Sequence, residues 1–191
     1  MLGNSQAQFE IGGSYLIGEK HYKSLVKRRD YAKAFEWLQK SAEQGNPGGQ
    51  IMLAAMYSDG NAVPKDERKS FEWELKAAVQ GNSVAQENLG YKYANGRGVE
   101  KDLVLAYGWY NLAAASKFAE DMKNWAPKVW RDELEKRLTD LQISEGQRLS
   151  SAWKNGQILV REARGVGGSA ESAISGGALR KKGSGTLFLI N

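Results

Sequence analysis

The sequence predicts an all-α protein, a right-handed α/α solenoid of three 36-residue helix-pair repeats followed by capping helices and a Gly/Ser-rich tail. The first observation is a tryptophan that returns every 36 residues, at Trp37, Trp73 and Trp109. The second is the phrase around each of them: YAKAFEWLQKSAEQGN, RKSFEWELKAAVQGN and LVLAYGWYNLAAASKF. A fixed period of this length is typical of repeat proteins, whose units stack side by side and present a surface.

The first helix of each repeat is expected within 48–60 and 84–96. Leucine and tyrosine lie four residues apart there, which places them on one helical face, in the pairs Leu53–Tyr57 and Leu89–Tyr93. The first repeat fits the same frame, with Ile17 in the leucine position and His21 in the tyrosine position. The inter-helix loop of that repeat, 24–30, then lacks a glycine.

The ends of the helices carry their own signals. Gly60 and Gly96 suit the left-handed position that follows a helix, because glycine has no Cβ. Asp66 and Asp102 suit the N-cap position of the second helix, where a carboxylate accepts hydrogen bonds from free backbone N–H groups. The second helix then runs through the tryptophan phrase.

The recurring apolar and aromatic residues are expected to form the core. This set comprises Trp37, Trp73, Trp109, Leu53, Tyr57, Leu89 and Tyr93. Replacing one buried tryptophan by alanine is expected to cost roughly 3–5 kcal/mol. A series of tryptophans that stack on a ligand is the alternative interpretation.

These residues resemble the Sel-one-like repeats, which are relatives of the tetratricopeptide repeat. The third repeat carries the pattern through Ala85, Leu89, Gly90, Tyr93, Gly96, Gly98, Val99, Asp102, Ala106, Trp109, Ala113 and Ala114. The resemblance covers about residues 7–118, as repeats 7–46, 47–82 and 83–118. It implies an adaptor or scaffold role, often in bacteria, without naming a partner.

The rest of the chain follows a different pattern. Residues 119–154 are predicted to form a degenerate unit and capping helices, because a solenoid needs an end that covers its last apolar face. Pro127 is expected to end or kink a helix in this part. Residues 155–191 are rich in Gly and Ser and indicate a flexible linker. The final GSGTLFLIN weakly resembles the first strand of trypsin-like serine proteases, so 155–191 could also contain the start of a truncated β domain.

Composition argues against chemistry within this chain. With one histidine and no cysteine, it offers neither a Ser-His-Asp triad nor an ordinary zinc site, and we predict no catalytic residue, cofactor or metal. The net charge of +5 lies mainly at the ends and lacks a nucleic-acid-binding signature. No apolar run is long enough to insert into a bilayer. Without a signal peptide the chain is expected to be cytoplasmic as written, or extracytoplasmic if its N-terminus is truncated.

Recognition is expected to use the first-helix side chains that lie between the framework positions, on the concave side of the solenoid. The predicted partner-binding residues are Lys20, Lys23, Gln50, Met52, Met56, Gln86, Asn88, Tyr91 and Lys92. Met52 and Met56 could instead fill gaps in the core.

The predicted function is therefore a non-enzymatic protein–protein interaction module that binds a peptide segment or helix in a concave groove. The alternative is the regulatory repeat arm of a larger enzyme, a trypsin-like serine protease fusion truncated at residue 191. Glycan binding, a third possibility, requires tryptophans that are exposed in the groove.

Overall fold

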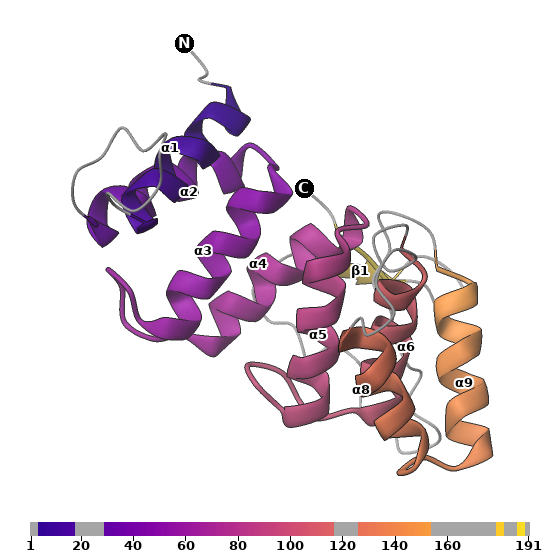
Figure 1. Cartoon of the computed structure of the whole chain (residues 1–191). Coiled ribbons are helices and arrows are strands. Elements are labelled where there is room, and N and C mark those ends of the chain that lie inside the picture. Colours follow the sequence, from indigo (N-terminus) through magenta and orange to yellow (C-terminus); the bar gives the residue numbers. More distant parts are fainter. Residues whose placement is uncertain (1–3, 18–28, 117–125, 154–178, 182–186, 190–191) are drawn as a thin grey trace. The chain divides into compact units, whose positions relative to one another are not determined.

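The computed structural model describes residues 4–17, 29–116, 126–153, 179–181 and 187–189. The chain divides into two compact units, Met1–Ala77 and Ala78–Asn191, with the boundary near the end of one helix. The two helices of the first repeat pack on each other, and so do the two helices of the third (Figure 1).

The first unit contains the first two repeats as helix pairs. Its helices are α1 (Ser5–Ile17), α2 (Tyr31–Glu43), α3 (Pro47–Asp59) and α4 (Glu67–Val79), the last of which crosses the boundary. Helix α1 packs on α2, and α2 packs on α3. Ala34, Leu38 and Met56 form a buried cluster here, against which partly buried aromatic side chains pack.

The second unit contains the third repeat and the capping helices. Its elements are α5 (Ser83–Asn95), α6 (Leu103–Ala114), α8 (Ala126–Glu135), α9 (Asp140–Ser151), β1 (Leu179–Lys181) and β2 (Leu187–Leu189). Helix α6 is the centre of this unit, since α5, α8 and α9 all pack on it. Eight of its twelve residues are buried.

The predicted caps are confirmed. Gly60 and Gly96 adopt left-handed φ angles of 76° and 68° after α3 and α5. Asp66 Oδ1 accepts a hydrogen bond from Lys69 N at 2.9 Å. Asp102 Oδ1 likewise accepts from the backbone of the first turn of α6. The local signals therefore set the helix boundaries in the second and third repeats.

Four of the seven residues expected in the core are buried, and the other three are buried in part. Leu53, Leu89 and Trp109 are 0% exposed, and Tyr93 is 8% exposed. The remaining three are partly buried: Trp37, Tyr57 and Trp73. A lysine ammonium lies over the ring of each of the two tryptophans, 4.9 Å from the centroid in Lys40–Trp37 and 3.9 Å in Lys76–Trp73.

The predicted register of the first repeat is wrong. In every repeat the N–H of the N-cap aspartate donates to the carbonyl oxygen of a first-helix tyrosine, in the pairs Asp30–Tyr15 (2.9 Å), Asp66–Tyr57 (2.8 Å) and Asp102–Tyr93 (3.0 Å). Tyr15 therefore holds the position assigned to His21, and the tyrosine-to-aspartate spacing is 15 residues instead of 9.

This six-residue difference shifts the whole first helix of the repeat. Ile17, expected at the leucine position, is the last residue of α1 and is 43% exposed. Gly12 occupies the crossing point instead, because a Cβ there would lie 2.7 Å from Leu38 Cγ. His21 lies outside the described residues. A strict 36-residue period therefore holds for the second helices but not for α1.

Helices α8 and α9 lie in the segment that was expected to cap the repeats. Pro127 lies in the first turn of α8, so it begins this helix rather than ending one. Thr139 caps α9 through a capping box with Gln142. Helix α9 approaches α6 closely at Gly146, where a Cβ would lie 2.7 Å from Tyr107 Cδ1. Trp130 on α8 is 51% exposed.

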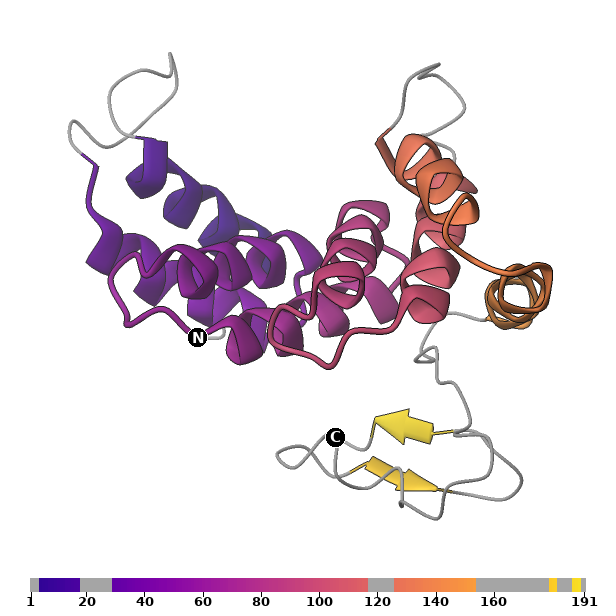
Figure 2. The same ribbon diagram turned by 90° about the horizontal axis from the view of Figure 1, so that it is seen from below.

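The last described segments are the two short strands. They pair antiparallel, with Arg180 opposite Phe188 (Figure 2). Residues 187–189 therefore form one strand of a two-stranded sheet. The flexible linker predicted for the residues before it lies outside the described parts of the chain.

Candidate partner-binding surface

The nine residues predicted to bind a partner fall into three groups in the structure. Lys20 and Lys23 lie outside the described residues, beyond the end of α1. A second group is buried: Gln50, Met56, Gln86 and Lys92. The third group retains access to solvent: Met52, Asn88 and Tyr91.

Gln50 and Gln86 join successive helices instead of facing a partner. The Gln50 side-chain amide donates to Ala42 O at 3.2 Å, and that of Gln86 donates to Ala78 O at 3.3 Å. Both glutamines are 3% exposed. Because a buried amide must keep its hydrogen bonds within the chain, these two positions belong to the repeat framework.

Met56 and Lys92 occupy the same position in consecutive repeats, and both are buried. Met56 is 2% exposed and lies in the apolar cluster of the first unit. Met52 is partly buried and packs against the same cluster, so both methionines contribute to packing, as the alternative interpretation expected. Lys92 is 4% exposed and interacts within the chain.

The exposed face of α5 carries the most accessible large side chains of the repeats. Tyr91 is 45% exposed and Val84 is 42% exposed, seven residues apart and therefore on one helical face. Glu87 and Asn88 lie between them along this face and are partly exposed. We call Val84, Glu87, Asn88 and Tyr91 the α5 face.

The Tyr91 side chain is held by its neighbours. The Arg97 guanidinium lies 5.7 Å from the ring centroid, and its Nη1 donates to the Tyr91 hydroxyl at 3.3 Å. The Asn95 amide donates to Tyr91 O at 2.8 Å. A tyrosine fixed in this way offers a large amphipathic contact at a small entropic cost.

The helix crossing beneath Tyr91 is unusually close. A Cβ on Gly90 would lie 2.6 Å from the Tyr110 ring, so only glycine leaves room for that ring. Tyr110 is 2% exposed. Its burial raises the pKa of its hydroxyl, and the charge of Glu87 adds to this effect. Partial burial also raises the pKa of the Glu87 carboxyl.

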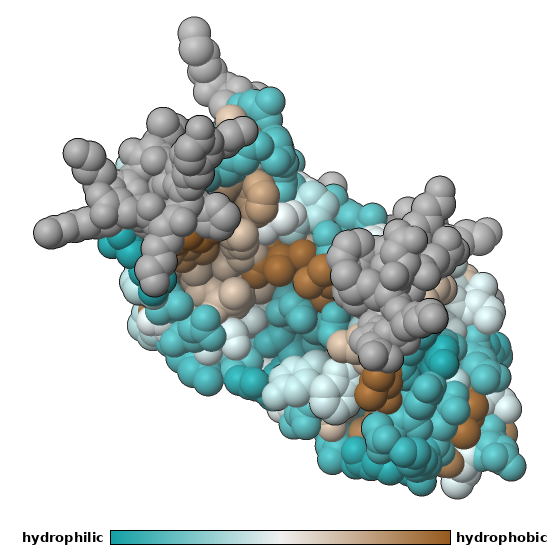
Figure 3. Space-filling view, in the orientation of Figure 1, coloured by the Kyte–Doolittle hydropathy of each residue, from teal (hydrophilic) through white to brown (hydrophobic). Residues whose placement is uncertain are grey.

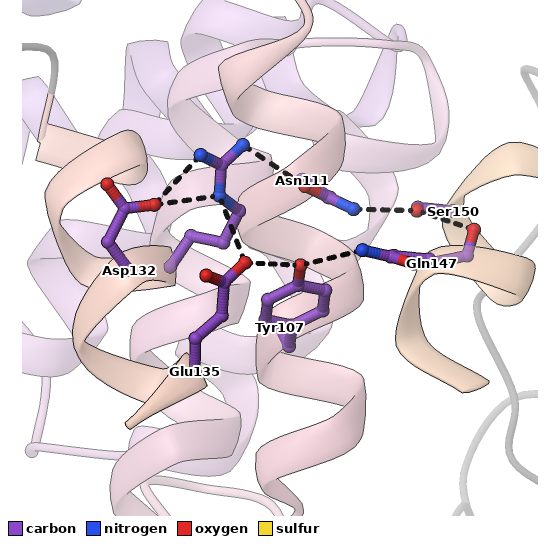
Figure 4. Close-up of polar contacts among 7 residues, drawn as sticks. Tyr107, Asn111, Asp132, Glu135, Gln147 and Ser150 are labelled. Carbon is purple, nitrogen blue, oxygen red and sulfur yellow. Dashed lines mark hydrogen bonds and ion pairs between the residues drawn. The ribbon is translucent and has the colours of Figure 1, made fainter. Parts of the chain in front are cut away.

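A second polar cluster lies where α6, α8 and α9 meet (Figure 4). The Tyr107 hydroxyl donates to Glu135 Oε1 at 2.7 Å and accepts from Gln147 Nε2 at 3.4 Å. Burial, followed by this bond to Glu135, raises the pKa of Tyr107.

The same cluster continues toward the C-terminal ends of α6 and α9. The Arg131 guanidinium contacts Asp132 at 2.8 Å and Asn111 at 3.4 Å, and Asn111 donates to Ser150. An open cavity of about 320 Å³ lies beside these residues. Because its charged and polar groups bond mainly to one another, we assign the cluster to attaching the cap to α6 rather than to binding a ligand.

Other kinds of site are not apparent in the described parts of the chain. No group of three or more His, Asp or Glu residues is placed there to hold a metal ion. Within those same segments, no helix is both long and apolar enough to cross a membrane. On the face that Figure 3 shows, the surface of the second unit is mostly hydrophilic, and its apolar side chains appear as separate spots.

Pairs of helices of 12 or 13 residues, joined by capped turns and packed through small residues, define an α/α solenoid of tandem repeats. The Sel1 repeat family profile matches residues 5–46, 47–82 and 83–118, and the chain belongs to this family. The match gives the first repeat 42 residues and the others 36, which agrees with the register that the structure shows.

Solved structures support the same class. The chain is similar to a protective antigen of uropathogenic Escherichia coli strains that displays an SLR fold, with 34% identity and a TM-score of 0.67. That match covers 78% of this chain but only 29% of the antigen. A Sel1 repeat protein from Oxalobacter formigenes is 30% identical with a TM-score of 0.54, over 59% of this chain and 82% of that one. No curated protein sequence matches the chain.

Sel1 repeat proteins are typically non-enzymatic and mediate protein–protein interaction. Sequence reasoning identified this class and named Tyr91, but it missed Val84 and Glu87. Glu87 differs in type from its counterparts, and this difference was a signal. The corresponding residues of the first two repeats, in the corrected register, are the apolar Phe9 and Ile51.

Proposed function

We propose that this chain is an adaptor that binds a peptide segment or one helix of a protein partner along the exposed side of its first helices. In the second unit the α5 face supplies the contacts. The buried residues of the original prediction, Gln50, Met56, Gln86 and Lys92, are not part of this proposal.

The observation that carries the proposal is the exposed Tyr91. A tyrosine ring costs free energy when it stays in water, and the third repeat needs no side chain of this size at that position. The corresponding residues, Gly13 and Ala55, leave the repeat intact in the first two units. Large aromatic residues are enriched among the side chains that dominate binding energy at protein interfaces.

Capture of a partner followed by a two-residue change tests the proposal. Val84→Ser with Tyr91→Ala should weaken binding of an identified partner by about a hundredfold, since removal of an aromatic anchor alone often costs ~2 kcal/mol or more. Helicity by circular dichroism should stay unchanged, because both side chains reach the surface. The matched control is Glu100→Ala, an exposed residue outside the α5 face.

Unchanged affinity of the double variant, measured by calorimetry with the purified partner, would contradict the proposed surface. The alternative function, a regulatory arm of a protease, depends only on the GSGT phrase at 183–186. The nucleotide sequence after the codon for Asn191 tests it: an open frame that encodes a His-bearing strand supports the fusion, and a stop codon removes it.

A further inference from the structure

The third repeat departs from the repeat pattern at two positions on one face of α5. Glu87 takes the position of Phe9 and Ile51, and Tyr91 takes that of Gly13 and Ala55. Phe9 packs against the apolar cluster of the first unit, so the fold favours an apolar side chain at the first position. A residue that breaks the local pattern without a packing gain indicates function.

The two residues that differ lie beside the close helix crossing. Glu87 and Tyr91 are one helical turn apart, and Gly90 between them leaves room for the Tyr110 ring. The charge of Glu87 also contributes to the raised pKa of the Tyr110 hydroxyl. The Glu87 carboxyl and the Tyr91 ring therefore lie one helical turn apart on the surface of the second unit, and the buried Tyr110 ring packs against Gly90 between them.

Within the described segments the Glu87 carboxylate forms no hydrogen bond and no ion pair, although other glutamates of the same unit, such as Glu133 and Glu145, pair with a lysine or an arginine. It is also partly withdrawn from water, and this burial raises its pKa. A partly desolvated carboxylate gains more from a nearby positive charge than a fully hydrated one does.

The neighbouring ring already shows the matching chemistry. The Arg97 guanidinium lies over the Tyr91 ring and bonds to its hydroxyl, so this aromatic group accepts a cation in the chain itself. A lysine ammonium or arginine guanidinium placed between the ring and a carboxylate gains from both. One turn earlier, Val84 is 42% exposed and offers an apolar contact.

We infer that Glu87 and Tyr91, on the exposed side of α5, form a recognition site for a basic side chain of the partner. The partner is then a cationic segment in which a lysine or arginine is followed, about one helical turn away, by an apolar residue that contacts Val84. This inference rests on the proposed function, because it names the chemistry of the segment that the α5 face binds.

Selection of binding peptides from a random-sequence library displayed on phage, with the full chain as bait, tests this inference. The expected result is enrichment of sequences that combine a basic and an apolar residue. Replacing the selected lysine by norleucine should weaken binding by about tenfold or more. Raising the salt concentration from ~0.05 M to ~0.5 M should weaken it further, because the contact is electrostatic.

Variants of the bait locate the site. Glu87→Gln should remove the preference for basic residues, and Tyr91→Leu should weaken every selected peptide while keeping α5 helical. Glu100→Gln, which removes an exposed carboxylate outside the α5 face, should leave selection unchanged. The melting temperature of each variant checks that it is folded.

The outcomes separate the two proposals. Enriched peptides without basic residues, or equal binding of a lysine peptide to the wild type and to Glu87→Gln, overturn the inference and leave the adaptor role standing. If no peptide is enriched and no partner is captured, the adaptor role itself is contradicted, and the inference fails with it.

Discussion

The second helix of every repeat carries a tryptophan at the same position, but its surroundings differ between the first two repeats and the third. Trp37 and Trp73 are partly exposed, and each lies under a lysine three residues further along its helix. Trp109 is 0% exposed, and the corresponding residue, Leu112, is apolar. The repeat pattern therefore places the tryptophan but does not determine how deeply it is buried.

A second lysine position shows the same contrast. Lys33 and Lys69 lie over the rings of Tyr15 and Tyr57 in the first two repeats, whereas the third repeat has Leu105. Helix α6 is covered by α8 and α9, so a charged side chain at these positions would be costly to bury. The first two repeats therefore have lysine where this helix face meets water, and the third has leucine where the capping helices cover α6.

The largest effect should come from the tryptophans themselves. Trp109→Ala should lower the free energy of unfolding by roughly 3–5 kcal/mol, because it leaves a cavity in the centre of the second unit. Trp37→Ala should cost only about 1–2 kcal/mol, since less area is buried. Urea unfolding of both variants measures the difference. Equal losses would show that the two environments are energetically alike.

The close contact of the cap is the next test. Gly146→Ala places a Cβ 2.7 Å from Tyr107 Cδ1 and 3.2 Å from Val104 O, which should push α9 away from α6. We expect a loss of about 1–3 kcal/mol. Gly45→Ala is the comparison variant, because Gly45 has a φ of 85° and a Cβ there would meet no atom within 4 Å. Its loss of stability measures backbone strain without steric overlap. A melting temperature of Gly146→Ala equal to that of the wild type would contradict the packing described here.

The lysines over the tryptophans should have a smaller effect on stability. Lys40→Leu with Lys76→Leu copies the third repeat, and each exposed cation–π pair that is lost contributes only ~0.5–1 kcal/mol. The new apolar side chains lie on exposed positions, so the double variant should self-associate. Light scattering at increasing protein concentration tests this, with Lys40→Gln and Lys76→Gln as the polar control. A variant that stays monomeric at every concentration would show that these positions are already covered.

The smallest effect concerns Glu87 and depends on pH. Because burial raises the pKa of this carboxyl in the folded chain, ionising it destabilises the fold, and this loss appears as the pH rises above the unfolded value near 4.5. Glu87→Gln should therefore be slightly more stable than the wild type at pH 7. The difference should vanish below pH 4, where the wild-type carboxyl is protonated. Thermal melts of both proteins across this pH range measure the difference in stability. A Glu87→Gln variant that is less stable than the wild type at pH 7 would contradict this prediction.

The sequence was sufficient to predict the helix pairs, because the caps and the spacing of leucine and tyrosine are local signals. Asp66, Asp102, Gly60 and Gly96 act as these signals require. The register of the first repeat could not be read from the period of the tryptophans. That period lies in the second helices, while the extra residues lie between Tyr15 and Asp30.

Part of the candidate site could not be predicted from the sequence. Gln50 and Gln86 look like free polar side chains in the sequence, and only the packing of successive helices shows that their amides reach the carbonyl oxygens of Ala42 and Ala78. Comparison of Phe9, Ile51 and Glu87 would have identified the third-repeat site, but it requires the corrected register. Burial and register were thus the missing information, rather than residue type.

The most direct test of the account maps a bound peptide onto the chain. A selected lysine-containing peptide is titrated into the 15N-labelled full chain, and the shifts of backbone amide signals are followed by NMR. The largest shifts should fall on α5 around Glu87 and Tyr91, with the amides near Lys40 and Lys76 unchanged. Largest shifts on α2 and α4 would contradict the claim that the third repeat carries the recognition site.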